Sequence, residues 1–387
     1  MNERKKILIL GSTGSIGKSA CNCIRRFKDR FSIAGLAAGN NVNLLIEQIH
    51  EFSPPSVYIA DPANADVIRE QFGKSISVRV YDKNDGIEQI VEETDYDILL
   101  NALVGAVGFR PTVAALKRGK RVALANKESL VIGGDYISSI IGQDKNRLLP
   151  VDSEHSAILQ CLPLGLADDT IESIILTASG GPFRSLPKES FASITPEQAL
   201  NHPTWSMGPK ITVDSSTLMN KGFEVIEAHH LFALPYSKLR VCVHPQSIIH
   251  SLVEFHDGSV LAQLGLPDME LPIQYALSWP ERLPISGKRL NLSDIRNLEF
   301  FEPDMGRFPC LRLCIEAGKI GGTAPAVVNA ANEIAVDLFL NKKIGFTDIA
   351  KIVESELNRH HPVEIDSVEV VMGIDGDVRE RVSALIF

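Results

Sequence analysis

Two carboxylates flank a serine at Asp152-Ser153-Glu154, and His155 follows directly. If the backbone stays extended after the preceding apolar run, Asp152 and Glu154 point to one side and Ser153 to the other. Two unpaired carboxylates on one side repel each other, and a divalent cation between them removes the repulsion. Because carboxylate oxygens suit hard ions such as Mg²⁺ or Mn²⁺, the stretch predicts a metal site. The alternative is an acidic turn that caps a helix beginning near Ser156.

A third carboxylate, Glu224, lies in a segment whose pattern predicts a helix from Leu218 to Phe232. Asn220 precedes it by four residues and Lys221 by three, so the three side chains share one helix face. We expect Glu224 to be a third ligand for the cation, with Asn220 and Lys221 beside it for an anionic group. The alternative is an exposed Lys–Glu pair, which contributes on the order of a few tenths of a kcal/mol.

Other polar stretches are suited to a phosphorylated substrate. Ser179 precedes two glycines that break a predicted strand, Ile171 to Thr177. Backbone N–H groups beside a hydroxyl form an anion nest, although an ordinary loop is the alternative. The Asp214–Ser216 stretch precedes the predicted helix at 218–232 as N-cap residues, and such a helix start also binds phosphate. Three carboxylates with a basic, hydroxyl-rich rim would suit a phosphorylated polyol or ketose.

The segment His202–Lys210 contains two prolines and a glycine, which hold His202, Trp205 and Met207 in one loop. Large apolar side chains on a loop either dock onto a core or close over a ligand. We expect a lid, with Trp205 as its apolar cover and His202 as its polar partner.

The beginning of the chain predicts a nucleotide site. The predicted strand Lys6–Leu10 is followed at once by Gly11-Ser12-Thr13-Gly14-Ser15-Ile16-Gly17, and a helix pattern then runs from Lys18 to Phe27. Glycines in such a turn let the backbone approach a pyrophosphate, whose charge the helix N-terminus favours. The spacing is GxxGxxG rather than the usual GxGxxG, so its position after the first strand carries the prediction.

The next strand indicates which dinucleotide binds. Phe31–Ala38 ends in Gly39-Asn40-Asn41, and no acidic residue is present there to bind a ribose 2′-hydroxyl. A 2′-phosphate would therefore meet no repulsion, and this favours NADP over NAD.

Alternating strands and helices continue through the first half and position these residues. Asn126, Lys127 and Glu128 directly follow one of the predicted strands, and ligands of parallel sheets gather at the carboxyl ends of strands. We expect Lys127 to be a cation for substrate oxygens, with a surface ammonium as the alternative. The predicted strands are Ser56–Ala60, Val78–Tyr81, Tyr96–Ala102 and Arg121–Ala125, and the predicted helices are Val42–Glu51, Ala63–Phe72, Gly86–Glu93 and Pro111–Arg118.

The second half predicts a different architecture. A helix pattern covers Ala157–Leu162, a strand covers Leu239–Val243, and the strands Ser247–Phe255 and Ser259–Leu264 flank a hairpin turn. These strands are apolar on nearly both faces, which suits a buried or subunit-facing sheet and favours a homodimer. We expect His250, within them, to belong to the core rather than to the site. Three further helix patterns follow, at Leu311–Glu316, Ala324–Leu340 and Phe346–Arg359.

The fold class is therefore α/β, and the 387 residues are too many for one ordinary core. We expect a Rossmann-like parallel sheet at 1–150 that binds NADPH. An α+β catalytic domain follows at 151–280, with the metal and substrate site, the lid and the dimerisation strands. A proline-punctuated linker at 281–304 leads to a small helical domain at 305–387.

Composition excludes several classes of function. The net charge of -9 argues against a nucleic-acid binder, and no apolar run is long enough to span a bilayer. Six cysteines form no paired CxxC sets and are typical of reduced, mostly buried thiols in a cytoplasmic protein. No signal peptide pattern is present at the N-terminus.

Six motifs appear in order along the chain: GSTGSIG at 11–17, LANKES at 124–129, PVDSEHSA at 150–157, ASGGPF at 178–183, HPTWSMG at 202–208 and DSSTLMNKGFE at 214–224. With them the chain resembles the 1-deoxy-D-xylulose 5-phosphate reductoisomerase family over essentially its whole length. The resemblance implies an NADP-dependent oxidoreductase that converts the ketose phosphate to 2-C-methyl-D-erythritol 4-phosphate, in the methylerythritol phosphate route to isoprenoids. It also implies NADPH and a divalent metal as cofactors, Mg²⁺ or Mn²⁺, with Co²⁺ as a further candidate.

The resemblance assigns roles residue by residue. The implied metal ligands are Asp152, Glu154 and Glu224. The implied catalytic group adds Lys127 and His202 to these three. The implied substrate contacts are Lys127, Ser153, Glu154, Ser179, His202, Trp205, Ser215, Asn220, Lys221 and Glu224. The implied nucleotide contacts are Thr13, Gly14, Ser15, Ile16, Gly39, Asn40, Asn41, Asn126, Glu128 and Gly208. One departure is Asn40, where many relatives carry a basic residue.

Two alternatives remain open from the residues. A plain NADP-dependent dehydrogenase of the homoserine or aldehyde type would not need three carboxylates and a phosphate nest together. A non-enzymatic NADP sensor has no reason to keep Glu224 with Lys221. In the implied reaction the metal chelates the ketose, the carbon skeleton rearranges, and the nicotinamide reduces the bound aldehyde while the lid excludes water. The residues leave open whether rearrangement is a retro-aldol/aldol pair or an α-ketol shift.

Overall fold

The computed structural model describes residues 4–72, 78–82, 85–162, 170–205, 207–285 and 287–385. The chain forms two compact units, each built from discontinuous segments. The first unit comprises residues 1–126, 139–152 and 269–285, and the second comprises 127–138, 153–268 and 286–387. Among the described residues, no helix is both long enough and apolar enough to cross a membrane.

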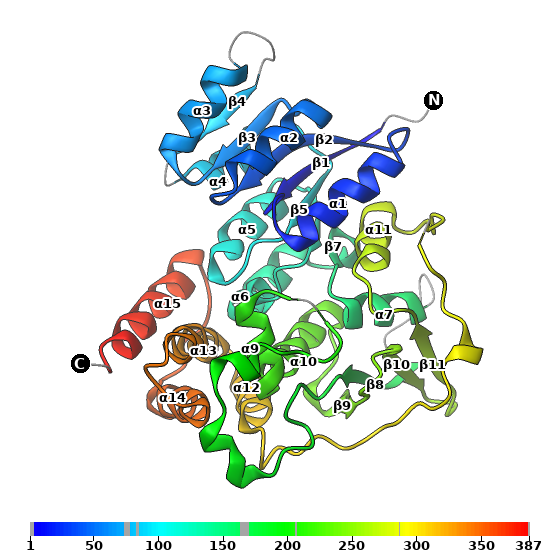
Figure 1. Ribbon diagram of the computed structural model, residues 1–387, viewed down its shortest axis with the longest axis vertical. Helices are drawn as coiled ribbons and strands as arrows, with labels where there is room; N and C mark the ends of the chain where they lie inside the picture. The colour runs from blue at the N-terminus through cyan, green and yellow to red at the C-terminus, as the bar shows by residue number, and fades with distance from the viewer. Residues whose placement is uncertain are drawn as a thin grey trace. The chain divides into compact units, whose positions relative to one another are not determined.

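A parallel sheet forms the centre of the first unit (Figure 1). Within the described residues its seven strands run in the order β4-β3-β2-β1-β5-β6-β7, with all neighbours parallel. The strands are β1 (Lys5–Leu10), β2 (Phe31–Ala38), β3 (Ser56–Ile59), β4 (Arg79–Tyr81), β5 (Ile98–Asn101), β6 (Arg121–Leu124) and β7 (Leu148–Pro150). Most of their residues are buried, as expected for a parallel sheet covered on both faces.

The helices that connect or follow these strands in the sequence belong to the first unit, except that residues 127–138 of one of them belong to the second. They are α1 (Ser15–Arg26), α2 (Val42–Phe52), α3 (Pro62–Phe72), α4 (Gly86–Glu93), η1 (Ala106–Gly108), α5 (Phe109–Lys117), α6 (Glu128–Ile141), η2 (Lys145–Arg147) and α11 (Glu270–Ser278). The carboxyl ends of β1 and β5 are neighbours, although the two strands are far apart in sequence. The chain order of the sheet reverses between them, and ligands of open parallel sheets bind at such a point.

The turn after β1 can form only with glycine at two positions. Gly11 has a φ of +83°, a conformation that side chains rarely adopt. A β-carbon on Gly17 would lie 2.3 Å from the carbonyl oxygen of Gly11, so the first turn of α1 packs directly on the glycine turn. The predicted helix therefore begins at Ser15, three residues earlier than the sequence pattern indicated.

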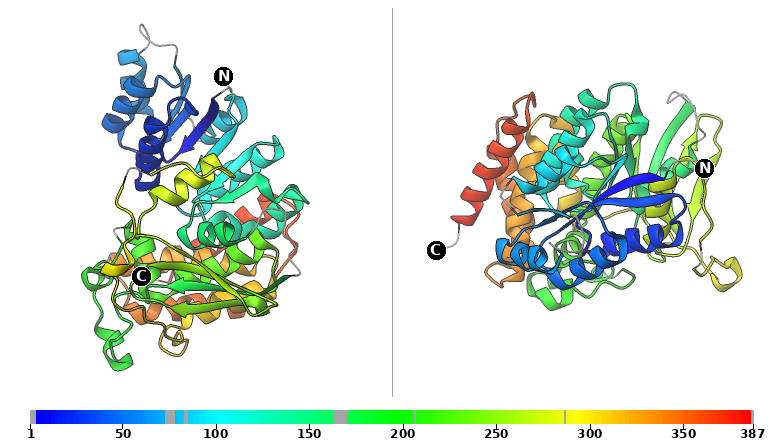
Figure 2. Two further views of the ribbon diagram at one scale, coloured as in Figure 1. Left: turned by 90° about the vertical axis from the view of Figure 1, so that its right-hand side faces the viewer. Right: turned by 90° about the horizontal axis from the view of Figure 1, so that it is seen from above.

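The second unit contains a mixed sheet and a set of helices, and Figure 2 shows both from two further sides. Within the described residues the sheet order is β11-β10-β8-β9, with β8 and β9 parallel and the other neighbours antiparallel. The strands are β8 (Ile171–Ala178), β9 (Leu239–Val243), β10 (Ile249–Phe255) and β11 (Val260–Leu264). The predicted hairpin is thus confirmed, with β10 and β11 joined by the turn at Asp257 and Gly258.

Helices of the second unit pack on this sheet and on one another. They are α7 (Ser153–Cys161), η4 (Lys188–Ser193), α8 (Pro196–Ala199), α9 (Pro209–Thr217), α10 (Met219–Phe232), η5 (Tyr236–Lys238), η6 (Leu292–Asp294), α12 (Pro309–Ile320), α13 (Ala324–Leu340), α14 (Phe346–Arg359) and α15 (Val368–Ser383). Phe183, Phe191 and Phe346 pack ring against ring and join the loop after β8 to the C-terminal helices. The helices α13 and α14 match their predicted bounds, and α15 lies in the predicted helical region, although no separate helix was predicted there.

Two predictions of local structure were wrong. The Asp152–Glu154 stretch is not extended, because the strand ends at Pro150 and α7 begins at Ser153. The residues before Leu218 do not form an N-cap, because Pro209 opens the separate helix α9. Leu218, with a φ of +60°, breaks the chain between α9 and α10.

All six cysteines lie in the described residues and none forms a disulfide bond. Five are buried, and burial raises the pKa of the Cys21 thiol to about 12 and that of Cys23 to about 11. They are structural, unreactive thiols, as the sequence indicated.

Candidate active site

Three carboxylates predicted from the sequence converge. One oxygen from each of Asp152, Glu154 and Glu224 lies within 4.8 Å of the others. Glu154 is in the first turn of α7, and Glu224 is in the middle of α10 with 1% of its side chain exposed. Asp152 is the residue at which the chain passes from the first unit to the second, and its place beside Glu154 follows from a separation of two residues.

Two buried lysines hold this group of carboxylates together. Lys221 Nζ lies 2.9 Å from Glu154 Oε1 and forms a second ion pair with Glu224, three residues along α10. Lys127 Nζ lies 3.2 Å from Glu224 Oε1. Burial pushes the pKa of Lys221 down, but attraction to Glu154 and Glu224 outweighs it, so the pKa of Lys221 is raised. The Lys221 ammonium group is therefore charged, and with Lys127 it places two basic groups against the three carboxylates.

The cluster fits a divalent cation. Three carboxylates carry three negative charges against two positive charges from Lys127 and Lys221, which leaves the group attractive to a cation. The donor atoms are all oxygens, the type that Mg²⁺ and Mn²⁺ prefer. Asp152 lies just before α7, Glu154 lies in the first turn of α7, and Glu224 lies in α10. All three carboxylates can therefore reach one small ion at once.

Polar neighbours complete the cluster. Asn220 Nδ2 lies 2.5 Å from Glu224 Oε1, and Asn220 Oδ1 accepts a hydrogen bond of 2.9 Å from Lys127. Ser153 Oγ donates to Glu154 Oε2 at 2.5 Å. The predicted shared face of Asn220, Lys221 and Glu224 is thus observed, and Lys221 contacts carboxylates here.

A second group of predicted residues gathers at Ser179. His202 Nδ1 accepts hydrogen bonds from the backbone N–H groups of Thr204 and Trp205, at 3.1 and 2.9 Å. The proton of the neutral ring therefore sits on Nε2, which donates to Ser179 Oγ at 3.0 Å. Burial, together with the nearby Arg184, lowers the pKa of His202, so the ring is neutral at physiological pH.

The two glycines after Ser179 give their loop its shape. Gly180 and Gly181 have φ values of +80° and +67°. A β-carbon on Gly181 would lie 2.8 Å from the carbonyl oxygen of Ser215, so this loop packs directly on the end of α9. Ser179 and Ser215, predicted separately as phosphate contacts, therefore lie on adjacent segments, and the Gly181 N–H is 3.3 Å from Ser179 Oγ.

His250 is buried, as its assignment to the core predicted, but it also lies near the loop that carries Trp205. Its ring centroid is 6.3 Å from that of Trp205 in the predicted lid. Burial lowers the pKa of His250, while the carboxylate of Glu154 opposes that shift and Lys221 adds to it. The assignment to the core was thus incomplete, because a strand position gives no sign of which side chains approach it from other segments.

Lys210 is a further residue that the sequence analysis missed. Its ammonium lies 2.9 Å from both Glu128 and Asp214, and Asn332 donates to the other oxygen of Asp214 at 2.8 Å. Burial opposes the charge on Lys210, but the two carboxylates outweigh it, and its pKa is raised. Lys210 therefore fixes α9, directly after Gly208, to Glu128 at the start of α6.

The glycine turn of the first unit fits a pyrophosphate. Gly14 is the N-cap of α1 and supplies no side-chain oxygen to the N–H groups that follow. These N–H groups and the positive end of the helix therefore favour an anion. Gly39, Asn40 and Asn41 lie exposed at the end of β2, and the side chain of Asn41 caps α2 by accepting from Leu44.

Asn126 forms side-chain hydrogen bonds that its position after β6 did not predict. Its side chain is buried and donates to the carbonyl oxygens of Leu103 and Gly105 at 3.0 and 2.9 Å. It thereby fixes the loop after β5, beside the carboxyl ends of the strands. Glu128 and Gly208, also predicted as nucleotide contacts, belong to the second unit.

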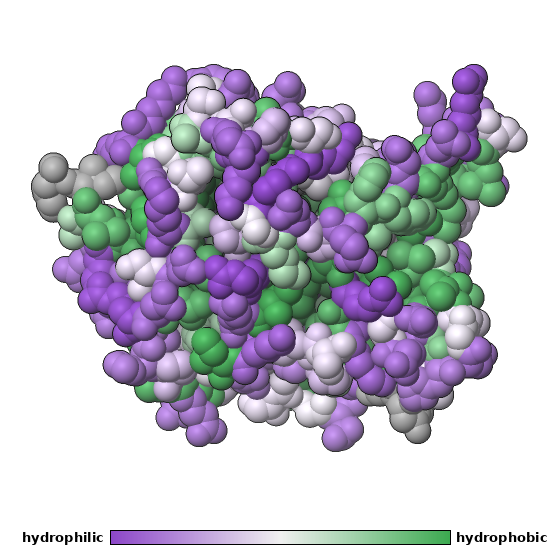
Figure 3. All heavy atoms as spheres, turned by 90° about the horizontal axis from the view of Figure 1, so that it is seen from below, coloured by the Kyte–Doolittle hydropathy of each residue, from purple (hydrophilic) through white to green (hydrophobic). Residues whose placement is uncertain are grey.

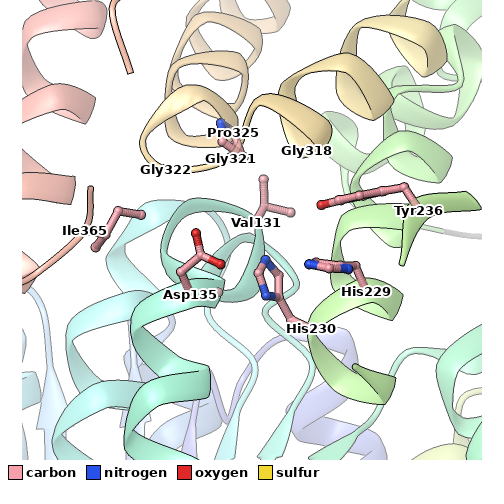
Figure 4. A pocket seen from close by; sticks show the side chains of 11 residues that line it. Val131, Asp135, His229, His230, Tyr236, Gly318, Gly321, Gly322, Pro325 and Ile365 are labelled. Carbon is pink, nitrogen blue, oxygen red and sulfur yellow. The ribbon is translucent and has the colours of Figure 1, made fainter. Parts of the chain in front are cut away.

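Two other hollows lie away from these groups. A small cavity of about 20 Å³ in the second unit is lined by Asp135, His229, His230 and Tyr236 among others (Figure 4). Its volume is that of roughly one water molecule, too little for a substrate. A larger groove of about 830 Å³ in the first unit is lined by Lys5, Arg121 and Trp279, at the amino ends of the strands and so opposite the glycine turn.

Models of one protein family match three consecutive parts of the chain. Residues 7–134 match a model described as 1-deoxy-D-xylulose 5-phosphate reductoisomerase, and residues 148–232 match the C-terminal domain of the same enzyme. Residues 264–381 match a model described as the DXP reductoisomerase C-terminal domain.

Relatives of known sequence and structure agree with these models. The 1-deoxy-D-xylulose 5-phosphate reductoisomerase of Prosthecochloris aestuarii is 53% identical over 381 residues, which are 98% of this chain and 99% of that protein. A structure of this reductoisomerase from Zymomonas mobilis in complex with NADPH is 44% identical, with a TM-score of 0.92 over 100% of this chain and 99% of that one. A structure of DOX-P reductoisomerase with NADPH, fosmidomycin and magnesium has the same TM-score at 39% identity, covering 98% of both chains.

Proposed function

Because this chain belongs to the 1-deoxy-D-xylulose 5-phosphate reductoisomerase family, we propose that its two groups of polar residues carry out the reaction of that family. The enzyme rearranges and reduces 1-deoxy-D-xylulose 5-phosphate to 2-C-methyl-D-erythritol 4-phosphate, with NADPH and a divalent metal, in isoprenoid precursor synthesis. The observation that carries the assignment to this site is the convergence of Asp152, Glu154 and Glu224 within 4.8 Å.

Each residue has a proposed role. Asp152, Glu154 and Glu224 would hold the cation, which when bound supplies a Lewis acid for the hydroxyl and carbonyl oxygens of the ketose. Lys127 and Ser153 would contact the same end of the substrate, because both already lie against these carboxylates. The proposed phosphate contacts are Ser179, Ser215, Asn220 and Lys221.

The chain's own groups would control protons and water during the reaction. His202 holds a proton on Nε2, directed at Ser179 Oγ, so it is placed to donate a hydrogen bond to a phosphate or hydroxyl oxygen there. Trp205, on the loop between α8 and α9, would cover the bound substrate and keep water from reactive intermediates. We expect this loop to close over the bound substrate during turnover.

The nucleotide would bind at the glycine turn of the first unit and would supply the hydride. Its proposed contacts are Thr13, Gly14, Ser15, Ile16, Gly39, Asn40, Asn41, Asn126, Glu128 and Gly208. The uncapped start of α1 and the close packing of Gly17 on Gly11 support the placement of the pyrophosphate. We further propose the division into a nucleotide domain at 1–150, a catalytic domain at 151–280, a linker at 281–304 and a helical domain at 305–387.

A homodimer in the cytoplasm is also proposed. The strand β11 lies at the edge of the second sheet and exposes Val260, Leu261 and Leu264, with 47%, 46% and 36% of each residue accessible. An exposed apolar edge strand tends to pair with another chain, and Figure 3 shows further hydrophobic side chains at the surface of one face. Light scattering should give the mass of two chains in solution, and Leu261→Lys should shift the protein toward one. A wild-type protein that stays monomeric would exclude the dimer.

Product analysis tests the function. The purified protein is incubated with 1-deoxy-D-xylulose 5-phosphate, NADPH and Mg²⁺, and phosphorus NMR follows the substrate. We expect one product phosphate that matches authentic 2-C-methyl-D-erythritol 4-phosphate, with one NADPH oxidised for each molecule formed. NADPH oxidation with simple aldehydes but not with the ketose phosphate would instead favour the plain dehydrogenase.

A further inference from the structure

A buried histidine and a buried glutamate lie directly behind the carboxylates of the proposed site. His155 follows Glu154 in α7, and Glu227 follows Glu224 by three residues in α10. Both side chains are 0% exposed, and His155 Nδ1 lies 3.3 Å from Glu227 Oε2. None of the roles assigned above uses either residue.

The histidine joins the two helices that carry the carboxylates. His155 Nε2 lies 2.9 Å from the carbonyl oxygen of Glu224. A carbonyl oxygen can only accept a hydrogen bond, so Nε2 carries a proton and donates it. The carbonyl is in the interior of α10, where its other lone pair serves the helix. The turn that holds Glu224 is thus fastened to α7, at the residue after Glu154.

The glutamate and a phenylalanine fix the orientation of this ring. The Phe232 ring stacks on the His155 ring with 6.4 Å between centroids and 10° between planes. The Glu227 carboxylate faces Nδ1, so the ring has a defined plane and a defined rotation in that plane. A fully buried carboxylate is costly, and an apolar side chain of the same volume is often at least as stable. A role in orienting the site would explain why a carboxylate occupies this position.

We propose that His155 and Glu227 are a positioning pair, which sets the spacing of Glu154 and Glu224 for a divalent cation. The inference rests on the proposed function only in taking these carboxylates as the metal ligands. Groups that hold the residues around a metal site typically change metal affinity by about 10- to 100-fold when removed. The competing interpretation is a second ion, because an oxygen of Asp152 also lies within 4.8 Å of atoms of both residues.

The experiment measures Mn²⁺ binding by calorimetry in the presence of saturating NADPH. Glu227→Leu removes the carboxylate and keeps a similar volume, whereas Glu227→Gln keeps an amide that can hydrogen-bond to Nδ1 whether that nitrogen donates or accepts. We expect Glu227→Leu to weaken Mn²⁺ binding by roughly 10-fold or more and Glu227→Gln by much less. NADPH affinity, read from its fluorescence, should stay within about twofold in both variants.

A matched control is available at another buried carboxylate in the same unit. Glu356 joins α14 to α15 through Arg381 at 2.9 Å and has 4% of its side chain exposed. Glu356→Leu should lower thermal stability but leave the Kd for Mn²⁺ unchanged. If Glu227→Leu behaves in the same way, the pair is merely structural and the proposal fails. Two Mn²⁺ ions for each wild-type chain would also overturn it, in favour of the second ion.

A second pair of variants covers the case in which Glu227→Leu does not fold. The amide nitrogen of Gln reaches about as far as Nε2 of histidine, whereas that of Asn stops near Nδ1. His155→Asn should therefore weaken Mn²⁺ binding more than His155→Gln, and equal affinities would contradict the proposal. The experiment measures Mn²⁺ binding and not turnover. If the wild-type protein failed to turn over the ketose phosphate, that result would contradict the proposed function, and the binding measurements would still test the positioning pair.

Discussion

The ammonium nitrogen of Lys127 lies 3.2 Å from Oε1 of Glu224, and less than a tenth of either side chain is exposed. The two residues are 97 positions apart in sequence, and they join the start of α6 to the middle of α10. A buried carboxylate of this kind needs a cation, and here it has two lysines and a site that fits a metal ion.

Glu224→Gln should abolish turnover and leave nucleotide binding intact. The amide keeps the shape of the side chain but removes one of the three negative charges, so the cation would be weakly held. We expect NADPH oxidation with the ketose phosphate to fall by roughly a thousandfold or more, because a metal-bound carbonyl is stabilised by several kcal/mol. Fluorescence titration should give an unchanged Kd for NADPH. A large loss of NADPH affinity would place Glu224 in the nucleotide site instead.

Lys221→Met should make the stability of the protein depend on metal. Without the ammonium group, Glu154 and Glu224 face each other with less compensation, and breaking a buried ion pair costs roughly 3–5 kcal/mol. Urea unfolding should show this loss without metal, and saturating Mg²⁺ should restore much of it. The same substitution at the exposed Lys351, which pairs with Asp348, should cost at most about 0.5 kcal/mol. A variant whose stability does not respond to Mg²⁺ would contradict the proposed site.

His230 should make the protein sensitive to acid. Burial, with a smaller contribution from His229, lowers the pKa of His230 from 6.5 to about 3. Below pH 6.5 the unfolded chain therefore takes up a proton that the folded chain refuses until about pH 3. Stability from this residue is present above pH 6.5 and is lost as the pH falls toward 3. His230→Gln should show a shallower fall in urea midpoint over this range, whereas an identical slope would show that His230 does not contribute.

Asn40→Arg should strengthen the preference for NADPH. Asn40 is exposed at the end of β2, and it is one of the proposed nucleotide contacts. A guanidinium there would form charge-assisted hydrogen bonds to a 2′-phosphate, and one such bond contributes about 1.5–3 kcal/mol. We expect the KM for NADPH to fall by roughly tenfold, with the KM for NADH unchanged. Equal effects on both nucleotides would place Asn40 away from the 2′-position.

The sequence predicted those features of the fold and of the site that depend on local pattern. The glycine turn, the shared face of Asn220, Lys221 and Glu224 and the hairpin at Asp257 are all set by spacings of a few residues. The prediction of an extended backbone at Asp152 and Glu154 was wrong, because a helix begins at Ser153. The helix dipole favours an acidic residue in this first turn.

Other features depend on contacts between distant segments. The β-branched residues after Pro209 resemble a strand, but proline at the first position of a helix favours α9. The partners of Lys210 are Asp214 in its own helix and Glu128, which is 82 residues away. His250 shows the same limit, since its approach to Trp205 follows from the loop before α9 and from no local pattern in β10.

Manganese located by anomalous scattering tests the central claim most directly. Crystals grown with Mn²⁺ and NADPH should show one anomalous peak within about 2.0–2.3 Å of an oxygen from each of Asp152, Glu154 and Glu224. Lys221 should then have moved from Glu154 toward the substrate side. A peak elsewhere, or Glu224 turned away from the ion while Asp152 and Glu154 bind it, would contradict the account.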